Sequence, residues 1–559
     1  MTSVPAGGKP APAADPAASQ PAVSQPSGAQ PAGGSAWARY GPPALVAGAV
    51  MAVLGGWGLA RSGSMGNDEV ATRWAALLSL RNLAHLLRHV DAVHGLYYLL
   101  MHGWVVLGSS PTVLRIPSVI SMIAAAVLIV ILARRLTGSS WAALFTGLVM
   151  ALTPTISYYA QTARSYALVY TCVLAATLAL LHALNGEQAG GRPRRWLLYG
   201  FLITLAAYLN EMALLVLAAH AVTVLLARYG RRTFLHWAVT AAVAAVLATP
   251  LLALSAREDG AVAWIPRPDL GDLRTLGHDY FGATTAVAAI ILVCVVAALL
   301  PPLGQRRRPP RPAGHTGRSG QEAAGADGAD AGAAAAWWRQ RGVSLPSVAA
   351  PLLVLPAALL LIESLVARPL YTDRYVLYGE AGAALLAGAG AYRIGRWLAG
   401  AAGQRWLVWV PGAVLCAAAL VLQLGAQQRV RTPDSRLYDF GGPSRYVAAH
   451  ARPGDGVLFF NDFFRKARLG YPADFRNVTD FAMAVSPTQA GNFRGVNKPV
   501  SAIRPLMLGY QRIWVVGWTP ERRLAASPVE AQAAVLRSRF SLAARRHYRN
   551  IWVTLWVRR

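Results

Sequence analysis

The chain has 559 residues, of which 55% are hydrophobic and only 14% are charged, whereas about a quarter of the residues of a soluble globular protein carry charge. Apolar stretches of about 18 to 22 residues recur along most of the chain, and each is long enough to cross a bilayer as a helix. This composition excludes a soluble multidomain enzyme, a disulfide scaffold and a largely disordered protein. It predicts an all-α multispanning membrane protein.

The net charge is +28, from 53 Lys and Arg against 25 Asp and Glu. Nearly all the basic residues are Arg in short loops between apolar stretches, a pattern typical of topology signals rather than of nucleic-acid binding. The three cysteines, Cys172, Cys294 and Cys416, lie inside apolar stretches without Cys/His metal spacing. We therefore expect neither a nucleic-acid partner nor a disulfide framework.

The N-terminal part predicts a tail, an anchor and an external loop. Residues 1–36 are rich in Pro, Ala, Ser and Gly and are predicted to be a disordered cytoplasmic tail. The first apolar stretch, Pro42 to Ala60, is expected to stay as a membrane anchor. It leads into a first external loop over 61–115.

Two segments of this loop have an apolar face. From Val70 to Val90 apolar residues recur at helical spacing with Arg and His on other faces, which predicts one amphipathic helix in the membrane interface. A second segment, Leu96 to Leu107, carries Tyr97, Tyr98 and Trp104, aromatic side chains that favour the headgroup level.

Ten further apolar stretches are predicted to span the membrane. They lie near residues 116–133, 141–158, 166–184, 196–210, 212–228, 235–254, 284–302, 345–366, 376–393 and 406–425. With the first stretch they give about eleven transmembrane helices, and together they define a transmembrane domain over 37–425.

Loop charge alternates along this domain. Five successive arginine-rich loops fall on one side, at 134–135, 192–195, 228–232, 306–311 and 393–405. Because loops rich in Lys and Arg stay in the cytoplasm, the N-terminus is predicted to be cytoplasmic, and both the first loop and the C-terminal segment external. The Arg/Pro- and Ala/Gly-rich segment 304–344 is predicted to be a disordered cytoplasmic loop.

Residues 426–559 have the composition of a small soluble α/β domain, which the loop order places outside the membrane. A helix is expected around Arg445 to Ala451, and strands at Val457–Phe460, Arg512–Val516 and Ile551–Val557. A polar cluster follows the first strand and favours a surface turn, with glycan or acceptor binding as the other interpretation. Its members are Asn461, Asp462, Arg465 and Lys466.

The most informative residues are Asp68 and Glu69, two adjacent carboxylates on the outer face. Carboxylates at a membrane interface are costly unless they are solvated or engaged, and one of them could act as a general base toward a hydroxyl. In the other interpretation, Asn67 or Asp68 caps the helix that begins near Val70, and Glu69 complements its dipole.

Further polar residues are predicted to reach the same face. Arg164 and Arg374 are the candidates to bind a phosphate, because a guanidinium matches phosphate oxygens in bidentate fashion and keeps its charge near lipid. The other members of this set are Asp91, His94, Tyr166, Asn210, Glu211 and Tyr375. A phosphate carried on a lipid tail would arrive at such a place.

These motifs resemble those of a known family. Asp68-Glu69, the segment His94-Gly-Leu-Tyr-Tyr-Leu-Leu and the run Leu114-Arg115-Ile116-Pro117-Ser118 are similar to motifs of the membrane glycosyltransferases of the C superfamily. Tyr159-Ala-Gln-Thr-Ala-Arg-Ser-Tyr166 and Asp373-Arg374-Tyr375 resemble the branch that contains protein O-mannosyltransferases and the lipid A aminoarabinose transferase. The resemblance covers residues 42–400 and is strongest from 64 to 170.

The resemblance implies roles for several residues. Such enzymes transfer a sugar from a polyprenyl phosphate to a hydroxyl on the external face. By position, Asp68 matches the proposed general base and Glu69 would support it. Asp91 and His94 occupy the place of the second loop motif, where the lipid A branch carries a Lys-Pro-Pro-like run that is absent here. The aromatic residues expected to contact substrate are Tyr97, Tyr166 and Tyr375.

Other properties stay open at this point. Some relatives place a divalent metal near these acids and others need none. Mannose is the first choice of sugar, with arabinofuranose, galactose and an amino sugar as alternatives, and the acceptor is a protein, a glycan or a glycolipid. A transporter or flippase of a lipid-linked sugar is the alternative function, although the sequence shows no paired helix interruption at matching positions in two halves, a feature typical of transporters. The third possible function is that of a non-catalytic membrane scaffold that displays the C-terminal domain.

Overall fold

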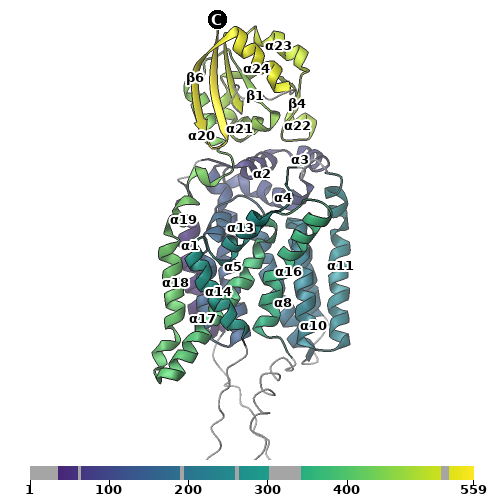
Figure 1. Cartoon of the computed structure of the whole chain (residues 1–559). Helices are drawn as coiled ribbons and strands as arrows, with labels where there is room; N and C mark the ends of the chain where they lie inside the picture. The colour runs from purple at the N-terminus through teal and green to yellow at the C-terminus, as the bar shows by residue number, and fades with distance from the viewer. Residues whose placement is uncertain (1–35, 61–63, 189–193, 259–263, 301–341, 518–527) are drawn as a thin grey trace, which may run out of the picture.

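The structure is a computed structural model that describes residues 36–60, 64–188, 194–258, 264–300, 342–517 and 528–559. The predicted tail over 1–36 and the loop over 304–344 lie almost entirely outside these residues. Figure 1 shows a bundle of helices with a mixed α/β domain seated at one end of it. The predicted helical part and the predicted C-terminal strands are both present.

The bundle is built mainly from helices that follow the predicted apolar stretches, with one further helix over 270–281 that was not predicted. They are α1 (Ala36–Gly56), α5 (Pro111–Thr137), α6 (Ser140–Leu152), α7 (Pro154–Ala160), α8 (Tyr166–Gln188), α9 (Arg194–Leu209), η3 (Glu211–Leu215), α10 (Val216–Ala227), α11 (Arg231–Ser255), α13 (Leu270–Phe281), α14 (Thr285–Leu299), α16 (Leu345–Val366), η5 (Asp373–Gly379), α17 (Glu380–Ala402), η6 (Arg405–Val408), α18 (Val410–Leu422) and α19 (Leu424–Arg429).

The predicted number of spans is not confirmed. Within the described residues, four helices are long and apolar enough to cross a membrane, or up to six if each of two bent pairs counts as one span. One pair, α6 and α7, bends by 66° at Pro154, which cannot donate the backbone hydrogen bond that would continue α6. The other, α13 and α14, bends by 70° at Gly282, whose φ of +109° suits glycine. The described part of the chain thus contains several candidate spans, two of which are interrupted by a bend.

The loop between α1 and α5 forms short helices. They are α2 (Asn67–Leu77), α3 (Leu80–Leu87), η1 (Ala92–His94), α4 (Gly95–Trp104) and η2 (Val105–Leu107). The prediction of one amphipathic helix from Val70 to Val90 is wrong, because the backbone is extended at Leu78 and Ser79. The Ser79 hydroxyl accepts the backbone N–H of Asn82 at 3.4 Å and so starts a new helix.

The aromatic residues of α4 lie deeper than expected. Tyr97 and Tyr98 are completely buried inside the protein, so their rings do not face lipid headgroups. Trp104 is partly exposed, and its Nε1 donates to the carbonyl of Val113 at 2.8 Å. The phenol rings of α4 therefore belong to the packed interior rather than to a lipid-facing belt.

The C-terminal domain has a five-stranded sheet in the order β2-β1-β5-β7-β6. β2, β1 and β5 are parallel, β7 runs antiparallel to β5, and β6 runs antiparallel to β7 at the edge of the sheet. The predicted helix and the three predicted strands are present as α20, β1, β5 and β7. The bounds are η7 (Pro433–Ser435), α20 (Gly441–His450), β1 (Asp455–Phe460), η8 (Asp462–Arg465), α21 (Lys466–Gly470), η9 (Pro472–Phe475), β2 (Val478–Asp480), β3 (Met483–Val485), α22 (Pro487–Ala490), β4 (Val496–Asn497), α23 (Val500–Met507), β5 (Arg512–Gly517), α24 (Pro528–Arg539), β6 (Phe540–Tyr548) and β7 (Ile551–Arg558).

This domain rests on the external-loop helices, as Figure 1 shows for α21 and α22 above α2 and α3. The rings of Trp74 and Phe493 meet edge to face at 5.4 Å. The backbone N–H of Met65 donates to the Tyr471 hydroxyl at 2.7 Å. Both apolar and polar contacts thus fix the domain over the loop that carries Asp68.

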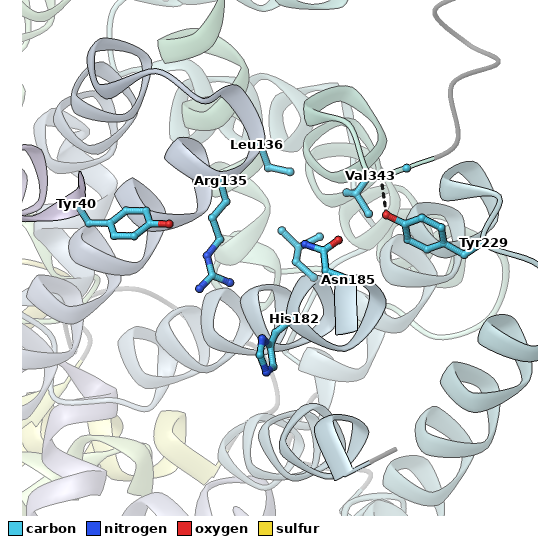
Figure 2. Close-up of a pocket in the computed structure, with 9 residues that line it drawn as sticks. Tyr40, Arg135, Leu136, His182, Asn185, Tyr229 and Val343 are labelled. Carbon is cyan, nitrogen blue, oxygen red and sulfur yellow. Dashed lines mark hydrogen bonds between the residues drawn. The ribbon is translucent and has the colours of Figure 1, made fainter. Parts of the chain in front are cut away.

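The opposite end of the bundle holds a cavity of about 510 Å³ (Figure 2). Arg135, Tyr229 and Val343 line it, and the Val343 N–H donates to the Tyr229 hydroxyl at 3.3 Å. Arg135 and Tyr229 lie in two of the arginine-rich loops assigned to one side, and Val343 lies at the end of the predicted cytoplasmic loop 304–344. The folded chain therefore brings those ends together, away from the loop that carries Asp68.

Candidate active site

Asp68 lies in the first turn of α2, which has Gly66 as its N-cap. Since the helix begins at Asn67, neither Asn67 nor Asp68 is the cap residue. The Asn67 side-chain amide donates to Asp68 Oδ1 at 3.1 Å, and no other hydrogen bond or ion pair to this carboxylate occurs among the described residues. One oxygen of a half-buried carboxylate is thus available to an incoming group.

The charge of Asp68 is set by its surroundings. Burial raises its pKa, but Arg164, Arg374 and His94 act in the opposite direction, and the pKa lies below its ordinary value. Asp68 is therefore a carboxylate at neutral pH, able to accept a proton. The two arginines singled out from the sequence lie close enough to act on it.

Glu69 points into the protein instead. Arg115 Nε donates to its Oε1 at 2.7 Å and Nη2 to its Oε2 at 2.8 Å, and both side chains are buried. The backbone N–H groups of Gly66 and Ala163 donate to the same carboxylate at 3.1 and 3.2 Å. Burial raises the pKa of Glu69, but Arg115 and Arg436 bring it down to about 2. With both oxygens occupied, Glu69 anchors the loop around Asp68.

Arg164 is held by an acid and a phenol. Its Nη2 lies 3.1 Å from Asp91 Oδ2, and its Nη1 donates to the Tyr98 hydroxyl at 2.6 Å. Tyr98 also donates to Asp91, and the Glu258 carboxylate accepts the backbone N–H groups of Asp91 and Ala92 at 2.7 and 2.9 Å. Asp91 adopts a left-handed φ of +64°, which Asp tolerates better than most residues. Arg164 Nε is buried, with no hydrogen-bond partner among the described residues.

Arg374 is held differently, by aromatic rings. Its guanidinium carbon lies 6.0 Å from the ring centre of Tyr166, 5.3 Å from that of Trp264 and 5.6 Å from that of Tyr375. Its Nε is buried without a hydrogen-bond partner, and no acid is paired with it in the described part of the chain. Ring faces attract a cation without using its N–H donors, so this guanidinium keeps its donors for an anion.

His94 lies between these groups. It is 2% exposed, and its Nδ1 lies 3.2 Å from the Ser165 hydroxyl. Its ring meets that of Tyr166 edge to face at 6.2 Å. Burial and Arg164 lower its pKa to about 3, so His94 is neutral at physiological pH and can serve as a polar wall of the site.

The structure thus brings together most of the residues predicted to form a site. Asp91, His94, Tyr166 and Tyr375 lie around the two arginines that act on Asp68. Tyr97 does not lie around these arginines, because it is packed in the hydrophobic core with 0% exposure.

Three residues at the site were not predicted there. The Tyr98 hydroxyl accepts a hydrogen bond from Arg164 and donates one to Asp91. Arg436 donates to Thr162 and to the Gln161 carbonyl, each at 2.6 Å, and lies 3.8 Å from Glu69. Lys466 donates to Asn67 at 2.6 Å. Both basic residues come from segments more than 270 positions away from their partners, so no local pattern could have revealed them.

The polar cluster of the C-terminal domain, predicted to be a surface turn, has two buried residues, so the prediction is wrong for these two. Arg465 is 1% exposed and its Nε lies 2.7 Å from Asp480 Oδ2, and Lys466 is 9% exposed. In the ranges that the structure describes, no group of three or more His, Cys, Asp or Glu is placed to hold a metal ion.

Comparison with known proteins gives a partial family match and a shared fold. Residues 95–254 match the family model described as dolichyl-phosphate-mannose-protein mannosyltransferase. The fold is similar to two crystal structures of ArnT from Cupriavidus metallidurans, one in the apo state and one bound to undecaprenyl phosphate, with TM-scores of 0.53 and 0.52. In each, identity is 14%, and the match covers 91% of this chain and 97% of ArnT. Among curated proteins the chain has no match. In its motifs, its match to the mannosyltransferase family model and its fold, the chain thus resembles the protein O-mannosyltransferase and ArnT branch of the membrane glycosyltransferases, as the sequence predicted.

Proposed function

We propose that the protein is an integral membrane glycosyltransferase that transfers a sugar from a polyprenyl-phosphate donor to a hydroxyl acceptor on the extracytoplasmic face. The observation that carries the proposal is the arrangement of Asp68 with Arg164 and Arg374. Among the described residues, one oxygen of the charged Asp68 carboxylate has no hydrogen bond, and two guanidinium groups act on this carboxylate, one paired with an acid and the other in contact with aromatic rings. The similarity in fold to ArnT, which has been crystallised with undecaprenyl phosphate bound, supports a donor of this lipid class.

The chemistry that we propose is a single displacement. The acceptor hydroxyl attacks the anomeric carbon and gives its proton to Asp68 while the bond from that carbon to the phosphate oxygen breaks. Polyprenyl phosphate leaves with the electron pair, and the arginines stabilise its charge. A phosphate leaves readily without a strong general acid, and attack opposite the leaving group inverts the configuration of the sugar.

The two arginines divide the work in this proposal. Arg374 binds the phosphate directly, because no acid among the described residues pairs with its donors. The charge of Arg164 is balanced by Asp91, and Arg164 contributes its Nε donor and its electrostatic field. His94, Tyr166 and Tyr375 line the space for the sugar.

The chain organisation belongs to the same proposal. The N-terminus is cytoplasmic, the transmembrane domain spans 37–425, and the α/β domain over 426–559 is extracytoplasmic. The position of that domain beside the Asp68 loop, opposite the ends that line the cavity of Figure 2, supports this orientation. Labelling single cysteines placed at Ser79 and Thr137 from each side of intact cells tests it.

The decisive experiment is a donor panel. Purified protein is incubated with polyprenyl-phosphate mannose, galactose, arabinofuranose and aminoarabinose, with and without a divalent cation, and donor loss is followed by mass spectrometry. We expect mannose to be consumed, because the matching family model is that of a mannosyltransferase. If no donor in the panel is consumed in the presence of protein, peptide, glycan and glycolipid hydroxyls, the proposal is wrong.

A further inference from the structure

Lys466 is the first residue of α21 and extends from the C-terminal domain to the first turn of α2. Its ammonium lies 4.8 Å from the ring centre of Phe463 and 5.4 Å from that of Phe493. The helix that carries it packs tightly on α2, since a Cβ added at Gly470 would lie 2.8 Å from Val70 Cγ2. The C-terminal domain therefore holds a buried cation in a fixed place beside the proposed base.

A short relay joins this cation to Asp68. Lys466 Nζ donates to Asn67 Oδ1 at 2.6 Å, and Asn67 Nδ2 donates to Asp68 Oδ1 at 3.1 Å. An ammonium can only donate hydrogen bonds, whereas the side-chain amide of Asn67 accepts at its oxygen and donates at its nitrogen. Lys466 therefore requires the oxygen of Asn67 to face it, and the amide nitrogen is left to face Asp68. If the side-chain amide of Asn67 were flipped, its oxygen would face a carboxylate oxygen of Asp68, and no hydrogen bond could form between them.

The ammonium of Lys466 is buried among charges of both signs. Burial disfavours the charged form and has the largest effect, so that the pKa of Lys466 is lowered to about 8. Asp68 and Asp91 favour the charged form, whereas Arg494 and Arg164 disfavour it. The charge of this residue is therefore lost at a pH that an enzyme assay can reach.

We propose that the C-terminal domain is part of the catalytic unit and that Lys466 is its positioning residue, which orients Asp68 through the amide of Asn67. The inference rests on the proposed function, because it assigns Asp68 as the base whose orientation matters. Above the pKa of Lys466 the neutral amine both donates and accepts, so the amide of Asn67 is no longer held in one orientation.

The test compares turnover and its pH dependence in the full-length protein. For the wild type we expect kcat to fall on an alkaline limb near pH 8. Lys466→Met should lower kcat about 100-fold, the size of effect expected when a reacting group is slightly misplaced, with little change in the donor KM. Its residual activity should lack the alkaline limb. Lys466→Arg, which keeps its charge at all these pH values, should retain more activity than Lys466→Met and also lack the limb.

The matched control is Lys498→Met in the same domain, where Lys498 Nζ donates only to the Phe481 carbonyl, at 2.9 Å, among the described contacts. This variant should keep the wild-type kcat and the alkaline limb. A wild type without an alkaline limb between pH 7 and 9.5, or a Lys466→Met variant with normal turnover or an unchanged limb, would overturn the inference. The proposed function fails separately, if the wild type consumes no donor or if Asp68→Asn retains full turnover.

Discussion

The guanidinium of Arg115 at the start of α5 is locked onto the carboxylate of Glu69 in α2 by two hydrogen bonds of 2.7 and 2.8 Å. Both side chains are almost completely inaccessible to solvent. The pair joins two of the sequence motifs, the acidic pair of the first loop and the Leu-Arg-Ile-Pro-Ser run of the next helix. Asp68, one residue before Glu69, takes its position from this ion pair.

We expect Glu69→Gln and Arg115→Met each to destabilise the protein by about 3 kcal/mol or more, because removing one partner leaves a buried charge uncompensated. The measurement is thermal unfolding in detergent. The matched control is Glu530→Gln, which breaks a partly exposed pair with Arg537 and should cost about 1 kcal/mol or less. Equal losses in the buried and exposed pairs would contradict the anchoring role.

Arg374 and Arg164 should respond differently to removal. Arg374→Met breaks no ion pair among the described residues, so we expect stability to change little while the donor KM rises and kcat falls. Arg164→Met strands the Asp91 carboxylate and should cost about 3 kcal/mol of stability as well as activity. Thermal unfolding combined with steady-state kinetics separates the two. A loss of stability in Arg374→Met equal to that in Arg164→Met would remove the distinction between a phosphate ligand and a structural ion pair.

His94 should make the protein less stable in acid. Its pKa is lowered to about 3 in the folded protein, against about 6.5 for an ordinary histidine. Between those values the unfolded chain binds a proton that the folded protein does not, so the free energy of unfolding falls as the pH falls. From pH 7.5 to 5 the loss due to this group is about 2 kcal/mol.

The measurement is the difference in unfolding between pH 7.5 and pH 5 for wild type and His94→Gln. The variant should lose less stability on acidification than the wild type. His450→Gln, at an exposed helix end of the C-terminal domain, should behave as the wild type does. An identical pH dependence in wild type and His94→Gln would show that His94 is not buried in its neutral form.

Much of the fold could be predicted from hydropathy, because apolar stretches that cross a membrane have a fixed minimum length. α8 begins at the predicted residue, whereas α5 extends beyond the predicted stretch 116–133 at both ends. The interruptions did not follow from length alone, since Pro154 bends a stretch predicted to be one span, and α13, which meets α14 at the bend of Gly282, was not predicted. Ser79 divided a helix whose apolar periodicity continued across it, because a cap acts on the backbone and leaves the periodicity unchanged.

Part of the candidate site could be predicted from the sequence for a similar reason. Asp68, Arg164 and Arg374 could be brought together because loop order assigns residues to one face of a membrane. Loop order could not show that Glu69 turns inward to Arg115 while Asp68 stays open, since the two carboxylates are adjacent in sequence. It also could not bring Arg436 and Lys466 to the site, because their positions depend on how the C-terminal domain packs on α2.

The most direct test of the proposed mechanism is the turnover of polyprenyl-phosphate mannose by wild type and Asp68→Asn, both folded and membrane-inserted. We expect the wild type to consume the donor with formation of glycosylated product, and the variant to lose a factor of about 10² to 10⁴ in kcat with unchanged thermal unfolding. Turnover by Asp68→Asn equal to that of the wild type would contradict the assignment of Asp68 as the base.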